Sequence, residues 1–261
     1  MKNKQKEPDM SYLKDNARFA GTGERDTNGY TLDEFLNSYD PRKYDSPCNT
    51  VDMLVFRSKE PYRRKDQPLK LLLIKRKNHP SIGFWATPGG FADVYENLED
   101  SAKRELLEET GVSGIPLIQL GTWGDYDRDP RWRIITTAYL ALVEGDLAEH
   151  AGDDAADAAW FDAKLVPAES MPSAGDSTQI PTENKVPAEA GAGKDGNKEY
   201  YTLLLDCPER DLHLSAEICV TWEIHGLLRK RHYSLIRSEK LAADHPLLIA
   251  DALLYLYDLA Q

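Results

Sequence analysis

The stretch at residues 88–112, PGGFADVYENLEDSAKRELLEETGV, constrains this chain more than any other part of its sequence. Residues 97–110 are predicted to be helical, because apolar residues recur every four positions from Leu98 to Leu106 and Gly111 is a natural C-terminal cap. Acidic residues crowd together near the end of this helix. Like charges three or four positions apart on a helix repel, at about 0.2–0.5 kcal/mol per pair, so the crowding predicts a compensating partner.

At about 100° per residue, Glu105, Glu108 and Glu109 fall within one arc that borders the apolar face of the helix. Partly buried carboxylates at this spacing raise one another's pKa. A hard divalent cation removes the conflict, because Mg²⁺ prefers oxygen ligands. Arg104 lies one turn before Glu108 and is expected to orient its carboxylate. The glycine pair Gly89-Gly90 lacks side chains, so the backbone there can approach a metal or a phosphate closely.

A solvated acidic face with an ordinary glycine cap would explain any one of these features alone. Together they resemble the complete Nudix box, in which every defined position is filled. The preceding run, FWATPGG, also resembles the approach to that box. The defined positions of the box are Gly90, Glu96, Arg104, Glu105, Leu106, Glu108, Glu109, Gly111 and the aliphatic Val112.

The resemblance implies an α+β fold, the Nudix α/β/α sandwich with a mixed β-sheet between helices. It also implies hydrolysis of a nucleoside diphosphate linked to another group. In that case Mg²⁺ (or Mn²⁺) would be held by three carboxylates and one backbone carbonyl, from Glu105, Glu108, Glu109 and Gly90. Arg104 would orient the glutamates, and Glu96 would support the loop or the metal shell.

The mechanism that the resemblance suggests is metal-assisted attack of water on a phosphorus of the pyrophosphate. The residue that takes the proton is left open. An acidic loop, EHAGDDAADAAWF, offers Glu149, Asp153 and Asp154 as candidate bases, although for each of them a solvated loop position is the favoured interpretation. The histidines form no ligand spacing, and none is assigned a catalytic role.

Two segments outside the box, DYDRDPRWRIITTAYLALV and YDPRKY, resemble ADP-ribose pyrophosphatases and the related Nudix regulators of NAD metabolism. Guanidinium groups bind phosphate oxygens bidentately, so Arg128, Arg131 and Arg133 are candidates for contacts to the phosphates or the terminal ribose. At least one of the three is expected to pair instead with Asp127 or Asp129.

Aromatic residues near these arginines are candidates for stacking on an adenine. They are Tyr126, Trp132 and Phe84. Packing at a sheet edge or at a subunit interface is the alternative for each of them.

The chain of 261 residues is predicted to contain four parts. An N-terminal arm covers residues 1–45, with a short helix whose capping box runs from Thr31 to Glu34, and a Nudix core covers 46–166. A flexible insertion rich in Pro, Ala, Gly and Ser covers 167–199. Residues 200–261 supply the C-terminal strand and helices that complete the domain.

Strands of the core are expected at residues 50–56, 69–76, 115–123 and 133–143, which are rich in β-branched and aromatic residues. Residues 158–166 indicate a further short strand, or a turn that leads into a helix. A last helix is expected to begin near Pro246 with Asp244 as its N-cap.

The composition of the chain limits the classes of partner that we expect this protein to bind. A formal charge of −12 argues against general nucleic-acid binding, and no apolar run approaches the roughly 20 residues that cross a membrane. The N-terminal sequence shows no secretory signal, and three cysteines at irregular spacing are expected to be reduced. We therefore expect a cytoplasmic protein and, by analogy with ADP-ribose pyrophosphatases, a homodimer.

The leading functional prediction is Mg²⁺-dependent hydrolysis of the pyrophosphate bond of ADP-ribose or a related nucleotide sugar. One alternative is a ligand-sensing transcription regulator without its DNA-binding domain, since such regulators place a winged helix after the last helix and this sequence ends at Gln261. Another is a catalytically silent nucleotide-binding module, against which the complete box argues.

Overall fold

The structure, a computed structural model, describes residues 16–145, 155–168 and 198–260. Internal contacts divide the chain into two units, Met1–Ser46 and Pro47–Gln261. The first unit contains α1 (Leu32–Ser38) and two short 3₁₀ turns, Ala17–Phe19 and Pro41–Lys43. Helix α1 begins at the predicted capping box and has no buried residue, so its cap stabilises it locally.

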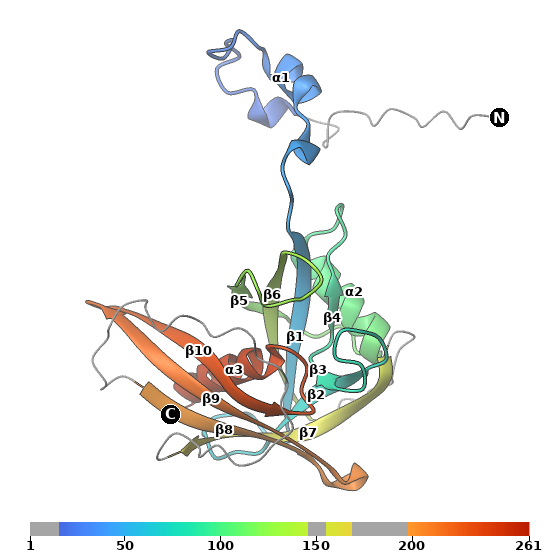
Figure 1. Ribbon diagram of the computed structural model, residues 1–261, viewed down its shortest axis with the longest axis vertical. Helices are drawn as coiled ribbons and strands as arrows, with labels where there is room; N and C mark the ends of the chain where they lie inside the picture. The colour runs from blue at the N-terminus through green and yellow to red at the C-terminus, as the bar shows by residue number, and fades with distance from the viewer. Residues whose placement is uncertain (1–15, 146–154, 169–197, 261) are drawn as a thin grey trace, which may run out of the picture. The chain divides into compact units, whose positions relative to one another are not determined.

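The second unit is built on one ten-stranded mixed sheet, in the order β10-β9-β8-β7-β2-β1-β6-β5, with β3 paired to β2 and β4 paired to β1 (Figure 1). Neighbours pair antiparallel except β1 and β6, which run parallel. The strands are β1 (Cys48–Ser58), β2 (Leu69–Arg76), β3 (Trp85–Ala86), β4 (Gly89–Phe91), β5 (Ile118–Trp123), β6 (Ile134–Glu144), β7 (Ala155–Ala168), β8 (Lys198–Cys207), β9 (Leu212–His225) and β10 (Leu228–Glu239).

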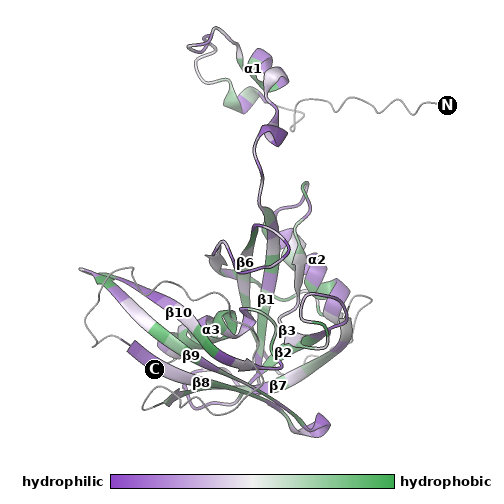
Figure 2. Ribbon diagram, in the orientation of Figure 1, coloured by the Kyte–Doolittle hydropathy of each residue, from purple (hydrophilic) through white to green (hydrophobic). Residues whose placement is uncertain are grey.

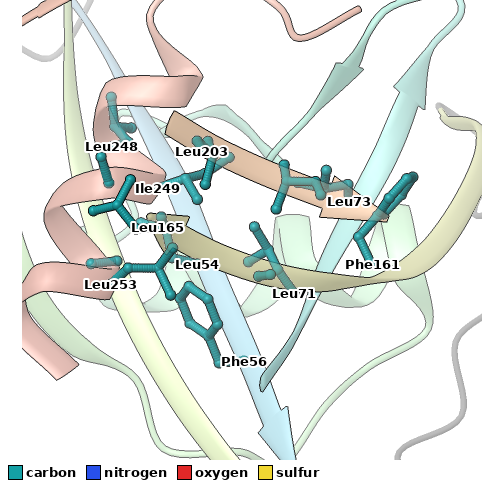
Figure 3. Close-up of a cluster of buried hydrophobic side chains, with 14 of the residues drawn as sticks. Leu54, Phe56, Leu71, Leu73, Phe161, Leu165, Leu203, Leu248, Ile249 and Leu253 are labelled. Carbon is teal, nitrogen blue, oxygen red and sulfur yellow. The ribbon is translucent and has the colours of Figure 1, made fainter. Parts of the chain in front are cut away.

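Two helices cover the two faces of this sheet. Successive side chains of a strand point to opposite faces, and along β1 Met53 packs in the cluster of α2 (Leu98–Thr110) while Leu54 packs in the cluster of α3 (His245–Leu259). Figure 3 shows Leu54 close to Leu253 of α3. Helix α3 is mostly hydrophobic in colour in Figure 2, as a helix buried against a sheet should be. The predicted α/β/α sandwich is confirmed.

The second half of the chain holds more strand than expected. Residues 158–166, expected as a short strand or as a turn leading into a helix, belong to the strand β7, which pairs with β2 and β8. The expectation of one strand and helices at 200–261 is wrong, because the described part of this region holds three strands, a 3₁₀ turn at Pro208–Arg210 and one α-helix. The burial of β9 alternates from Leu214 to Val220, the period-two pattern of a strand, and this signal was present in the sequence.

The predicted insertion at 167–199 lies, apart from its ends, outside the described residues. Its ends belong to β7 and β8, which are antiparallel neighbours with Ala168 opposite Tyr200. Within the described ranges, none of the helices is long and apolar enough to cross a membrane.

Candidate active site

Helix α2 presents its acidic residues at the rim of the core, as predicted. Leu106 is buried in the cluster against the sheet, and Gly111 ends the helix with a φ of 72°, a conformation that favours glycine. Glu109 is 8% exposed, whereas the side chains of Glu105 and Glu108 are 15% and 55% exposed. The three carboxylates therefore range from buried to half-exposed along one edge of the helix.

Arg104 holds the acidic residues of the box together. Its Nε donates to both carboxylate oxygens of Glu96 at 3.1 and 3.0 Å, and its Nη1 donates to Glu105 at 2.6 Å and Glu108 at 3.1 Å. Its Nη2 reaches the carbonyl oxygen of Phe91 at 3.1 Å. These contacts, that to Glu105 first, raise the pKa of Arg104. One guanidinium thus orients three glutamates of the box, Glu96, Glu105 and Glu108, and holds the loop before α2.

The two glycines of β4 lie against the carboxylates. The backbone N–H of Gly89 donates to Glu109 Oε2 at 2.7 Å. A Cβ atom on Gly90 would lie 2.3 Å from Glu105 Oε2, and one on Gly89 would lie 2.3 Å from the carbonyl oxygen of Val51. A side chain at Gly89 would meet the backbone of β1, and one at Gly90 would force the Glu105 carboxylate to move, so the close approach that the sequence predicted depends on both glycines.

The environment of Glu109 favours a positive charge beside it. Burial raises its pKa to about 8, and the charges of Glu105 and Asp52 add to the rise, while the Gly89 N–H and the charge of Arg76 oppose it. A hard divalent cation would compensate these buried oxygens. In the described part of the chain, however, no three Asp, Glu, His or Cys side chains are already gathered as a metal site. The carboxylate oxygens present fit such a cation, although those of Glu105 and Glu108 both accept hydrogen bonds from Arg104.

A cavity of about 340 Å³ opens beside these residues. Its acidic side is formed by Glu105, Glu109 and the buried Asp52 of β1. Other parts of its wall come from the end of β2, the loop between β5 and β6, and the start of α3. The cavity therefore collects residues that are far apart in the sequence.

Arg76 and Arg131 are two of the three guanidinium groups that line the cavity. Arg76 donates from Nε to the carbonyl oxygen of Pro80 at 2.7 Å, and burial followed by the charge of Arg131 lowers its pKa. Arg131 pairs with Asp129 through contacts of 3.0 and 2.8 Å and lies over the ring of Phe91, 5.2 Å from its centroid. Two like charges in one partly buried space suit an anionic ligand.

The three arginines predicted to contact the substrate differ in their positions relative to the cavity. Arg131 and Arg128 line the cavity, whereas Arg133 donates to the carbonyl oxygen of Asp125 at 3.1 Å and is not part of the lining. The expected ion pair with Asp129 is formed by Arg131. Arg128 is paired as well, but with Asp244.

The aromatic candidates lie away from the cavity wall. Tyr126 and Trp132 are 79% and 55% exposed, and Phe84 packs against the apolar cluster of Ile74. The aromatic ring that does line the cavity is Phe91. The proposed loop bases Glu149, Asp153 and Asp154 lie outside the described residues, so their role stays a prediction.

Three further residues at the cavity were not foreseen. Asp52, Thr87 and His245 all line it, and Thr87 Oγ1 lies 3.0 Å from Asp52 Oδ1 and 2.7 Å from His245 Nδ1. Asp52 could have been noticed as the one charged residue of the apolar run TVDMLVF. No local pattern marks His245.

Comparisons with known proteins agree with this architecture. The model of the NUDIX domain family matches residues 48–179, half of the chain. An ADPR-responsive transcriptional repressor, NtrR, from Acinetobacter baylyi is 42% identical over 42% of this chain and 42% of its own length. An ADP-ribose pyrophosphatase from Methanocaldococcus jannaschii is 45% identical over 48% of this chain and 68% of its own length.

A solved structure shares the fold over most of the chain. It is the crystal structure of a MutT/nudix family protein from Enterococcus faecalis, with a TM-score of 0.58 and 28% identity over 88% of this chain and 70% of that one. The Nudix box, the sandwich on which it is mounted and the family match lead to one conclusion: this chain belongs to the Nudix family.

Proposed function

We propose that this protein is a pyrophosphatase that uses Mg²⁺ or Mn²⁺ to hydrolyse a nucleoside diphosphate linked to another group, with ADP-ribose or a related nucleotide sugar as its substrate. One observation carries the proposal. A single cavity joins the carboxylates Glu105 and Glu109 to the guanidinium groups of Arg76 and Arg131. This is the charge pattern that a metal-bound diphosphate requires.

The residues of the box have different roles in this proposal. Glu105, Glu108, Glu109 and the carbonyl of Gly90 hold the cation, which when bound supplies an electrophile for phosphate oxygens and an acidified water. Arg104 keeps two of the glutamates in place through its contacts of 2.6 and 3.1 Å. Arg76 and Arg131, which line the same cavity, bind phosphate oxygens and offset the negative charge that grows on the leaving phosphate.

The substrate class is supported by two relatives. The Methanocaldococcus jannaschii relative is named for ADP-ribose hydrolysis, and the Acinetobacter baylyi relative is named for its response to ADPR. The cavity, at about 340 Å³, lies at the lower end of the range of small-molecule sites, roughly 300–1,000 Å³. It is large enough for a diphosphate and an adjoining sugar.

The test is a product assay with Mg²⁺ over a panel of ADP-ribose, NADH, dinucleoside polyphosphates, nucleotide sugars and oxidised nucleoside triphosphates. Wild type should release AMP from ADP-ribose, and Glu109→Gln should lose this activity. Glu99→Gln is the matched control, because Glu99 is an exposed acid of the same helix whose contact is with Lys103. Equal, negligible turnover by wild type and Glu109→Gln over the whole panel would rule the enzyme out.

A ligand-sensing role is the second candidate, and the similarity to the Acinetobacter baylyi repressor favours it. Calorimetry with ADP-ribose distinguishes the two roles. Binding without turnover in the presence of Mg²⁺ would support a sensor or a silent binding module, whereas binding followed by AMP release would support the enzyme. The predicted homodimer is checked in the same samples by light scattering.

A further inference from the structure

His245 lines the cavity beside the acidic helix, and no role has yet been given to it. It is the first residue of α3, and it meets Thr87 from the link between β3 and β4. The side chain of His245 is 12% exposed. The guanidinium groups of Arg76 and Arg131 line the same cavity. A ring nitrogen of His245 is therefore a candidate contact of the ligand that these arginines bind.

The backbone of Thr87 determines which ring nitrogen carries the proton. Its N–H donates to His245 Nδ1 at 3.3 Å. A peptide N–H can only donate, so Nδ1 presents a lone pair, and the ring is neutral with its proton on Nε2. The hydroxyl of Thr87 lies 2.7 Å from Nδ1 and 3.0 Å from Asp52 Oδ1, and its one proton can point to either. The hydroxyl thus permits this tautomer, and the backbone N–H requires it.

The Nε2–H group of His245 has no acceptor within the described ranges. All contacts of the ring in these ranges are made by Nδ1. The buried side-chain atoms without a partner in these ranges do not include Nε2, so solvent reaches this atom. Because Nδ1 is engaged by Thr87, Nε2–H is the polar group of the ring that remains for a ligand in the cavity.

The proton on Nε2 limits the kind of ligand that His245 can contact. An N–H group binds acceptors such as phosphate oxygens, whereas a metal ion requires the lone pair of a ring nitrogen. This tautomer therefore excludes Nε2 as a metal ligand. It adds a neutral hydrogen-bond donor to a cavity in which Arg76 and Arg131 already favour an anion.

The position of His245 is fixed from both sides. The segment before α3 is hydrogen-bonded to β3, where the Trp85 N–H donates to the Lys240 carbonyl at 2.8 Å. The preceding residue, Asp244, is held by Arg128 through two contacts of 2.9 and 3.0 Å. A donor that is anchored in this way need not be ordered when the ligand binds, which favours affinity.

We propose that His245 binds a phosphate oxygen of the substrate through Nε2–H, as a neutral donor that Thr87 positions; this rests on the function proposed above. The ligand is a diphosphate, whose oxygens accept from His245 as well as from Arg76 and Arg131. His245 neither gains nor loses a proton in this role. It contributes to the affinity for the diphosphate and to its placement in the cavity.

The tautomer is tested on the wild-type protein without any substrate. Nitrogen-15 NMR of labelled histidine separates the two ring nitrogens, and comparison with His245→Gln assigns the signals. At a pH where the ring is neutral, the expected result is a protonated Nε2 and an unprotonated Nδ1. A proton on Nδ1 and none on Nε2 would overturn the proposal, whether or not the protein proves to be a pyrophosphatase.

Imidodiphosphate, a diphosphate whose bridging nitrogen resists hydrolysis, tests the contact itself. Added with Mg²⁺ to wild type, it should move the Nε2–H proton signal downfield, because a hydrogen bond to a charged acceptor is shorter and stronger. Binding that leaves this signal unchanged would overturn the proposal and leave the enzyme intact. Absence of binding would also overturn it, while the product assay with ADP-ribose decides independently whether the protein is an enzyme.

Two variants separate the donor from a structural role of the ring. The amide nitrogen of His245→Gln lies near the position of Nε2, whereas that of His245→Asn lies near Nδ1. The Asn variant should bind imidodiphosphate about tenfold or more weakly, the effect of losing one hydrogen bond to a charged group, and the Gln variant should keep most of the affinity. Circular dichroism checks that both variants fold.

His213→Ala is the control for these measurements, because His213 is exposed and pairs with Asp206 away from the cavity. Its affinity for imidodiphosphate should equal that of wild type. Wild-type affinity in His245→Asn, or equal losses in the Asn and Gln variants, would show that Nε2–H does not bind the diphosphate. Either result would leave the hydrolysis of ADP-ribose to be judged by its own assay.

Discussion

Arg128 and Asp244 form a bidentate ion pair, with Nε to Oδ2 at 2.9 Å and Nη2 to Oδ1 at 3.0 Å, between the β5–β6 loop and the start of α3. The side chain of Arg128 is only 8% exposed. The sequence predicted Arg128 as a substrate contact and Asp244 as a helix N-cap, and Asp244 does occupy the N-cap position of α3, although its side chain makes no capping hydrogen bond. The ion pair holds one wall of the cavity together.

Breaking this pair should destabilise the second unit. Asp244→Ala leaves the guanidinium of Arg128 buried without its partner, and the loss of one member of a buried pair costs about 3–5 kcal/mol. Urea unfolding measures the change. The double variant Arg128→Met/Asp244→Ala should recover part of the loss, since no uncompensated charge remains, and strictly additive effects would show that the pair is not coupled.

Gly90→Ala should disrupt the acidic site and leave the fold intact. The new Cβ would lie 2.3 Å from Glu105 Oε2, so the Glu105 carboxylate must move away from its position. We expect at least a tenfold loss of Mg²⁺-dependent turnover, with an unchanged circular dichroism spectrum. Gly121→Ala is the matched control, since nothing lies within 4 Å of its added Cβ. Equal activity of the two variants would contradict the close approach.

Glu109 should make stability depend on pH when no divalent cation is present. Its pKa is raised from 4.5 to about 8 in the folded protein, so the folded state binds the proton more tightly than the unfolded state. Stability should therefore fall as the pH rises from about 4.5 to about 8. Glu109→Gln removes this contribution, and urea unfolding of both proteins from pH 5 to 9 measures the difference.

Mg²⁺ provides the complementary measurement for Glu109. A cation that binds the ionised carboxylate should stabilise wild type more at high pH than at low pH, because it competes there with fewer protons. Glu109→Gln should show a smaller stabilisation at every pH. A cation effect of equal size in both proteins would contradict a role for Glu109 in holding the metal.

Arg76→Ala should weaken substrate binding. A hydrogen bond to a charged group contributes about 1.5–3 kcal/mol, so the variant should show a roughly tenfold or larger rise in KM for a diphosphate substrate. Steady-state kinetics measures it. Arg64→Ala is the control, because Arg64 is exposed, pairs with Asp66 and does not line the cavity. An unchanged KM for Arg76→Ala would show that Arg76 does not contact the phosphates of the substrate.

The sequence alone determined the acidic helix and the glycines before it. Spacing of three and four residues places Glu105, Glu108 and Glu109 on one edge of any helix, and Gly111 ends that helix through a conformation that favours glycine. The strands at residues 50–56 and 69–76 could also be predicted, because apolar runs of that length are typical of buried strands. These are local properties, within the reach of a short window of sequence.

The tertiary structure decided the rest of the site. Thr87 meets His245 across 158 positions of sequence, and Arg128 meets Asp244 across 116. No periodicity connects residues at such separations, because strand order and the placement of α3 on the sheet bring them together. The sequence therefore determined which residues can hold a cation, and only the fold determined which residues surround it and which histidine faces the cavity.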